Sequence, residues 1–171
     1  MVLCMMLTMV PSAFAEGADG DTLQNKINQA SENATITLDK AYTESITIPE
    51  GKTITLDLNG QTLINEEGKH TITNEGTLTI VGTGTVDNVS HGKGAVYNDA
   101  GATCTILGGN YTRSQENGQS DSDSGGNSWY AIKNFGTMTI GEEGAPNDAV
   151  KVSFTGKYSS LVANGLSLIH I

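Results

Sequence analysis

The sequence predicts an all-β solenoid, a parallel β-helix assembled from a short strand–turn–strand unit that recurs. Three observations support this: the unit repeats, apolar residues and threonines alternate within it, and its turns contain Asn and Gly. Each copy reads apolar-x-Asn, a Gly turn, then Thr-apolar-Thr-Ile. Copies occupy residues 72–80, 96–106 and 132–140, and a fourth begins at 162–165. A unit this short cannot bury a core alone, so the copies must stack.

Within the first copy, Leu78 and Ile80 face one way, whereas Thr77 and Thr79 face the other. This period of two predicts a half-buried strand of residues that suit a pleated surface. We interpret the Asn-x-Gly segment as a tight turn, since Asn and Gly tolerate positive φ. Stacked copies predict a ladder of side-chain amides, made by Asn74, Asn98, Asn134 and Asn164.

The chain begins with an apolar run, residues 1–15, that ends in Ala13-Phe14-Ala15. This ending fits signal-peptidase cleavage after Ala15, so we predict a secreted or cell-surface protein. The run is too short to span a membrane, and a buried N-terminal strand is the alternative. The basic segment that normally opens a signal peptide is missing, which suggests a start upstream of Met1. Residues 16–21 follow as an acidic linker.

Residues 22–32 predict a short amphipathic helix, capped by Asp21 or Thr22, with Leu23 and Ile27 on one face. We expect it to cover the open first coil of the solenoid, whose edge would otherwise invite aggregation. Strands are predicted next at residues 34–38, 45–48, 53–58 and 62–64, with turns at 49–52 and 59–60.

The stretch 46–63, Ile-Thr-Ile-Pro-Glu-Gly-Lys-Thr-Ile-Thr-Leu-Asp-Leu-Asn-Gly-Gln-Thr-Leu, resembles the opening coils of pectin-lyase-like proteins secreted by gut-type bacteria. The Asn-x-Gly-Thr copies extend the resemblance over residues 22–165. It implies a right-handed, single-stranded parallel β-helix. That family is a mixture of polysaccharide lyases, hydrolases, adhesins and uncharacterised surface proteins, so the resemblance implies a fold and no activity.

Two stretches interrupt the strand rhythm. Residues 111–128 are polar and Gly/Ser-rich, which predicts a projecting loop, and 141–148 are irregular before a strand at 150–154. The last six residues, 166–171, lack the expected Thr-apolar-Thr-Ile. We interpret them as an aberrant tail on an N-terminal fragment, with a final edge strand as the alternative.

The net charge of −10, with a single Arg, argues against nucleic acid and anionic membranes as partners. It also disfavours a site for acidic polysaccharide. Cys4 is expected to leave with the leader. Cys104 takes the apolar place of Leu78 and Met138 in sister copies, which predicts a buried, inert thiol.

Candidate catalytic residues are sparse. Pectate lyases, as the resemblance implies, bind calcium through acidic residues on one sheet and use a basic residue as proton acceptor. Asp57, Asp87 and Asp99 have different offsets from the repeat, and Arg113 heads the predicted loop, a poor platform for a base. His91, in Ser-His-Gly-Lys-Gly, lacks the accompanying carboxylate pair of inverting hydrolases, so we interpret it as an exposed turn residue.

Asp121 and Asp123 resemble the start of a calcium loop, but Ile132 stands where an EF-hand requires Glu. We therefore expect no cofactor and interpret this segment as a polar loop, with weak calcium binding as the alternative.

The sequence thus predicts a non-catalytic structural or adhesive module that binds an extracellular glycan or host surface. Candidate sugar-stacking residues are Tyr97, Tyr111, Trp129 and Tyr130, for which packing at coil edges is the alternative. A second hypothesis makes the chain the N-terminal part of a polysaccharide lyase or glycoside hydrolase whose catalytic coils lie downstream. A third is ice binding through stacked Thr-x-Thr pairs, which strand propensity alone also explains.

Overall fold

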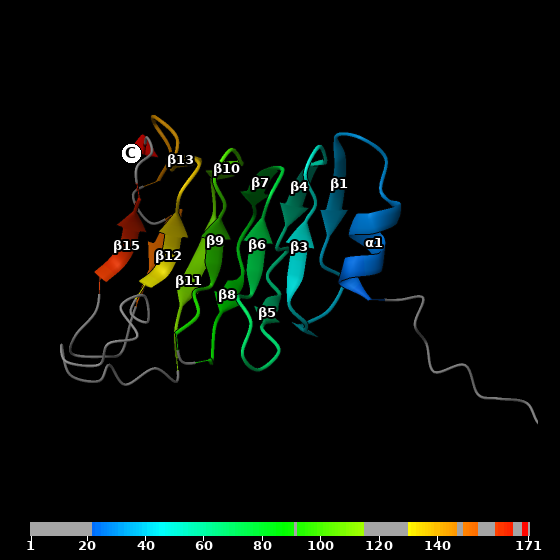
Figure 1. The fold of residues 1–171 in the computed structure, drawn as a ribbon, viewed down its shortest axis with the longest axis horizontal. Coiled ribbons are helices and arrows are strands. Elements are labelled where there is room, and N and C mark those ends of the chain that lie inside the picture. The colour runs from blue at the N-terminus through cyan, green and yellow to red at the C-terminus, as the bar shows by residue number, and fades with distance from the viewer. Residues whose placement is uncertain are drawn as a thin grey trace, which may run out of the picture.

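The computed structural model describes residues 22–90, 92–114, 130–146, 149–153, 160–165 and 169–170. The chain winds through three parallel sheets, one strand in each sheet per coil, with a short helix at the N-terminal end (Figure 1). The predicted parallel β-helix with a short N-terminal helix is confirmed. The signal-peptide and linker predictions, 1–15 and 16–21, lie outside the described residues.

Every pairing within the sheets joins a strand to the one three places later in the chain. Sheet A contains β1 (Ala34–Thr37), β4 (Thr53–Asp57), β7 (Thr77–Val81), β10 (Thr103–Ile106), β13 (Thr137–Ile140) and β16 (Ile169–His170). Sheet B contains β2 (Tyr42–Thr43), β5 (Thr62–Ile64), β8 (Thr85–Asp87), β11 (Gly109–Thr112) and β14 (Val150–Val152). Sheet C contains β3 (Ile46–Ile48), β6 (Ile72–Asn74), β9 (Val96–Asn98), β12 (Tyr130–Asn134) and β15 (Ser160–Asn164).

The repeat recognised in the sequence covers a strand of sheet C, the turn that follows (the C–A corner) and the next strand of sheet A. Its copies are in register, because Cys104 pairs with Leu78 on one side and Met138 on the other. All three side chains are fully buried. Burial raises the pKa of the Cys104 thiol to about 12, so it remains protonated and unreactive at neutral pH.

The core is a narrow aliphatic column, as expected from a chain with few aromatic residues. Inward-facing side chains from successive coils fill it, as shown by Ile54, Leu78 and Cys104, which are paired neighbours on sheet A. Burial of this aliphatic surface is the main stabilising term for such a stack. Tyr111 is an aromatic residue within this aliphatic core. Its ring is fully buried, and its hydroxyl donates to the Gly108 carbonyl over 2.8 Å.

Helix α1 (Leu23–Gln29) begins at Thr22, whose hydroxyl accepts from the Asn25 N–H over 3.1 Å. The Glu44 carboxylate accepts from the Leu23 and Gln24 N–H groups, both over 2.8 Å. Two of the N–H groups that a helix leaves unpaired are thus satisfied by a residue of the first coil.

The helix also covers the edge of β3. The Gln24 amide donates to the Thr47 carbonyl over 2.9 Å and accepts from the Thr47 N–H over 2.7 Å. At the other end of the helix, the Lys52 ammonium donates to the carbonyls of Ile27, Asn28 and Ala30. Helix α1 ends before the predicted Glu32 because Ala30 has extended backbone angles.

Two sequence interpretations are wrong in detail. Gly76 and Gly136 do not have positive φ. They are needed for space, since a Cβ at Gly76 would lie 2.6 Å from the Lys52 carbonyl oxygen, and one at Gly136 would lie 2.5 Å from that of Asp99. The loop predicted from residue 111 begins later, because Tyr111 and Thr112 belong to β11.

Two residues of the predicted tail, Ile169 and His170, form β16 and pair with Met138 and Thr139 of β13. Among the described residues, no helix is long and apolar enough to cross a membrane.

Candidate binding faces

A ladder of asparagine side chains fixes the C–A corner. The four asparagines of the repeat lie one above another at the ends of β6, β9, β12 and β15: Asn74, Asn98, Asn134 and Asn164. Each amide donates to the oxygen of the next, over 2.7, 2.7 and 2.9 Å. The first three are fully buried, so these bonds satisfy groups that would otherwise be costly to bury.

The outer face of sheet C carries an aromatic stack. Tyr97, the central residue of β9, is half-buried, and its ring lies on that of His70 with centroids 4.7 Å apart and planes at 26°. On the other side, the Phe135 ring lies 5.7 Å from the Tyr97 ring, tilted by 51°. Phe135 is 37% exposed, which is high for such a large apolar side chain. The three rings form a partly exposed aromatic surface that we call the aromatic patch.

His70 is neutral at physiological pH. Burial, and then the positive charge of Lys93, lower its pKa from 6.5 to about 4. The Gly94 N–H donates to Nδ1 over 2.9 Å, so the ring proton of neutral His70 lies on Nε2. The imidazole is therefore a rigid member of the patch that can donate from Nε2.

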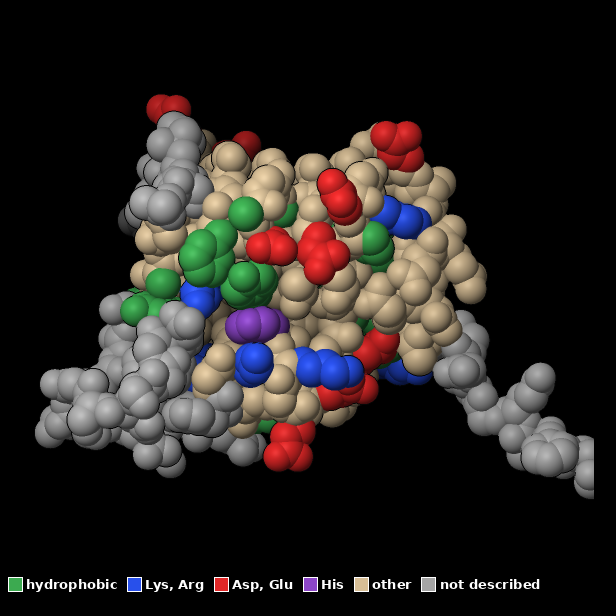
Figure 2. Space-filling view, in the orientation of Figure 1, with side chains coloured by type: hydrophobic (Ala, Val, Ile, Leu, Met, Phe, Trp, Pro, Cys, Tyr) green, Lys and Arg blue, Asp and Glu red, His purple; other side chains and the backbone are tan. Residues whose placement is uncertain are grey.

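Two lysines border the patch. The Lys133 ammonium, from the middle of β12, lies 5.0 Å from the centre of the Phe135 ring. Burial, and then the positive charge of Lys93, lower the pKa of Lys133. Within the described residues, neither lysine forms an ion pair with a carboxylate. In Figure 2 the histidine lies between basic side chains and hydrophobic ones on this face.

Carboxylates gather at the C–A corner, beyond the aromatic patch. Glu50, Glu75 and Asp99 line a hollow of about 350 Å³ at successive coils. The charge of Asp99 contributes, after burial, to a raised pKa of Tyr97. The described residues nevertheless contain no group of three His, Cys, Asp or Glu side chains arranged to hold a metal ion.

Sheet A presents a different outer face, made largely of threonine. One column consists of Thr53, Thr77, Thr103 and Thr137, which are paired in register. The parallel column consists of Thr35, Thr55, Thr79, Thr105 and Thr139. All are exposed or half-buried. The strand spacing of about 4.8 Å therefore sets a regular array of hydroxyl and methyl groups.

The four predicted sugar-stacking residues do not form one surface. Tyr97 lies at the centre of the aromatic patch, whereas Tyr111 is fully buried in the core. A buried ring offers no face to a sugar, so Tyr111 is not a surface candidate. Tyr130 is half-buried at the start of β12. Trp129 lies outside the described residues, as do Asp121, Asp123 and His91.

The three aspartates considered for a lyase-like calcium site belong to different sheets. Asp57 ends β4 in sheet A, Asp87 ends β8 in sheet B, and Asp99 follows β9 in sheet C. Asp87 is buried and accepts hydrogen bonds from the N–H and hydroxyl of Ser114. Arg113 is fully buried and donates to the Ser90 carbonyl, so it belongs to the interior and not to a projecting loop.

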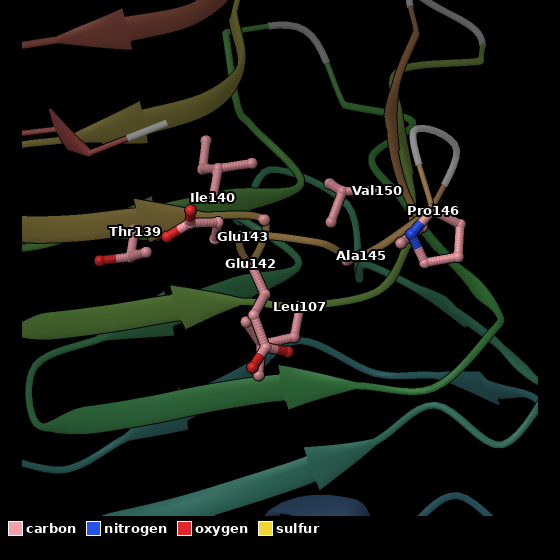
Figure 3. A pocket seen from close by; sticks show the side chains of 10 residues that line it. Leu107, Thr139, Ile140, Glu142, Glu143, Ala145, Pro146 and Val150 are labelled. Carbon is pink, nitrogen blue, oxygen red and sulfur yellow. The ribbon is translucent and has the colours of Figure 1, made fainter.

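A larger, mostly apolar pocket of about 800 Å³ opens beside β13 and β14 (Figure 3). The side chains of Leu107, Ile140 and Val150 stand around it, and Pro146 closes one side. The stretch between the end of β13 at Ile140 and the start of β14 at Val150 is longer than the one between β10 and β11 in the preceding coil. Two adjacent glutamates, Glu142 and Glu143, also line the pocket.

Sequence reasoning missed four members of the sheet C site: His70, Lys93, Lys133 and Phe135. Aligning the repeat copies could have found two of them. Tyr97 and Lys133 hold the same place before the ladder asparagine, and Phe135 holds the place of Asp99 after it. His70 and Lys93 lie in turns outside the repeat, so no periodic signal marks them.

The chain matches no protein-family model, no curated protein and no solved structure. The assignment of a parallel β-helix is therefore based on the structure alone, and the surfaces of the molecule are the basis for proposing a function.

Proposed function

We propose that this chain is a non-catalytic, secreted or cell-surface β-helix module that binds glycans through the outer face of sheet C. The observation that carries the proposal is the aromatic patch, in which Tyr97 and Phe135 offer partly exposed rings on a rigid sheet. Sugars pack the C–H faces of their rings on such surfaces, because burial of this apolar area is favourable. The predicted leader and the resemblance to pectin-lyase-like surface proteins support the location.

The aromatic side chains of the patch are fixed by neighbouring backbone and side-chain contacts before any ligand binds. Tyr97 stands on a central strand of its sheet, and His70 beneath it is fixed by the Gly94 N–H. Phe135 follows Asn134, whose side chain is part of the buried ladder. Aromatic groups that are already ordered lose little conformational entropy when a ligand binds.

A glycan array with the full chain tests this proposal. We expect binding to be lost or reduced at least tenfold in Tyr97→Ala and Phe135→Ala. Thr105→Lys, on the outer face of sheet A, serves as the folded surface control and should bind as the unsubstituted chain does. Binding that survives both aromatic substitutions, or an array with no bound glycan, would contradict the proposal.

A second function is favoured by one observation, the register of the threonine columns on sheet A. The coils differ in length, but the insertions lie at the turns and leave the strands aligned. A flat, repetitive array of hydroxyl and methyl groups could order water as an ice lattice does. Thermal hysteresis that is present in the unsubstituted chain and Tyr97→Ala, but absent in Thr105→Lys, would support this function. No hysteresis in any variant would exclude it.

A further inference from the structure

The sheet C site is polarised across its width. Gly94, which directly follows Lys93, lies against the backbone of Tyr130 and Ala131 in β12, the strand that carries Lys133. Lys133 is in register with Tyr97, whereas Asp99 and Glu75 line the hollow at the C–A corner. This pattern is unexpected in a chain with nine basic and nineteen acidic residues. Neither ammonium group forms an ion pair with a carboxylate of the described residues, so an anion bound between them would lower their mutual repulsion.

Building on the proposed glycan function, we propose that the site binds a glycan with one anionic substituent at its end, held between Lys93 and Lys133. The sugar that bears the carboxylate or sulfate stacks on Tyr97, and neutral sugars continue across Phe135. His70 donates from Nε2 to an oxygen of the ligand, and Asp99 and Glu75 accept hydrogen bonds from sugar hydroxyls.

The charge distribution selects against a densely charged polyanion. Screening limits electrostatic interactions to about 8 Å at physiological ionic strength, so the two lysines dominate the field only near themselves. A polysaccharide with a carboxylate on every sugar would be repelled by Asp99 and Glu75 at the C–A corner. It would also be repelled by the protein as a whole, whose net charge is −10. A single terminal acidic group avoids that repulsion.

The test compares four probes by titration calorimetry with the full chain: lactose, 3′-sialyllactose, 3′-sulfolactose and polygalacturonate. We expect both singly charged probes to bind at least tenfold more tightly than lactose and than polygalacturonate, on a per-site basis. The two singly charged probes distinguish a carboxylate site from a sulfate site.

Variants identify the charges responsible. Lys93→Gln and Lys133→Gln should each weaken binding of the charged probes by about two- to fivefold, as expected for exposed ion pairs. The double variant should bind charged probes and lactose alike. Lys151→Gln, on sheet B, removes the same charge elsewhere and should leave the affinities unchanged.

Equal affinity for lactose and the charged probes would overturn this inference and leave the proposed glycan function intact. Preference for polygalacturonate would overturn it as well. Failure of every probe, together with an empty glycan array, would overturn both proposals.

Discussion

The ionisation of His70 makes the stability of the aromatic patch depend on pH. Its pKa is about 4 in the folded chain and near 6.5 when exposed, so the unfolded chain binds more protons between these values. Its contribution to stability is therefore complete above pH 6.5, declines as the pH falls toward 4, and changes no further below that. The protonated ring would also repel Lys93 and turn an N–H toward the Gly94 N–H.

This predicts that the free energy of unfolding falls more steeply between pH 6.5 and 4 in the unsubstituted chain than in His70→Asn. Asparagine can accept from the Gly94 N–H through Oδ1 but does not titrate. Urea denaturation at several pH values provides the measurement. Parallel pH profiles for the two chains would contradict the assignment of this slope to His70.

Asn98 lies inside the amide ladder, between Asn74 and Asn134. Its amide donates to the Asn134 oxygen and accepts from Asn74, and it also donates to the Thr137 carbonyl over 3.1 Å. Replacing it removes one hydrogen bond from each of the buried amides of Asn74 and Asn134, and one from the Thr137 carbonyl.

We expect Asn98→Ala to lower the free energy of unfolding by about 1–3 kcal/mol for each buried partner that stays unsatisfied. Asn110→Ala, which removes an amide from the outer face of β11, should cost less than about 0.5 kcal/mol. Urea denaturation of both variants measures the two free energies of unfolding. Equal decreases would contradict a stabilising role of the ladder beyond that of a surface amide.

At the scale of the element, the C–A corner depends on close backbone approach between coils. A Cβ at Gly136 would lie 2.5 Å from the Asp99 carbonyl oxygen and 2.8 Å from the Asn98 amide nitrogen. Both atoms belong to the preceding coil and are held by its hydrogen bonds. Making room for a Cβ would therefore require the two coils to move apart.

We therefore expect Gly136→Ala to destabilise the chain by about 1–3 kcal/mol, the usual cost of overpacking. Ala102, at the same corner of the preceding coil, is the matched control, because Ala102→Gly should cost only about 0.5–1 kcal/mol of backbone entropy. Thermal unfolding of the two variants measures this. A Gly136→Ala chain as stable as the unsubstituted one would show that the corner relaxes.

The elements that sequence reasoning predicted are those with a periodic signal. Thr62–Ile64 was predicted with the bounds that β5 has, and the strands of sheets A and C followed from the Thr-apolar-Thr-Ile copies. In sheet B, β5 and β14 were predicted, whereas β2, which has only two residues, and β11, which begins with Gly109, were not. The reason for the corner glycines was also missed, since it depends on a contact between coils.

At the scale of the whole molecule, the stack converts sequence-distant residues into continuous faces. His70 and Tyr97 are twenty-seven residues apart, and Tyr97 and Phe135 thirty-eight, yet their rings are in contact. The strand pattern predicted the stacking of coils but not which turn residues would meet. Two faces result, a polarised aromatic one on sheet C and a uniform threonine one on sheet A, so binding functions can be separated by mutation.

The most direct test of the central claim is an NMR titration of the ¹⁵N-labelled full chain with 3′-sialyllactose. We expect chemical-shift changes concentrated at Gly94, Tyr97, Lys133 and Phe135, with the threonine strands of sheet A unaffected. Shifts confined to sheet A, or none at all at ligand concentrations in the millimolar range, would contradict the claim that sheet C is the glycan-binding face.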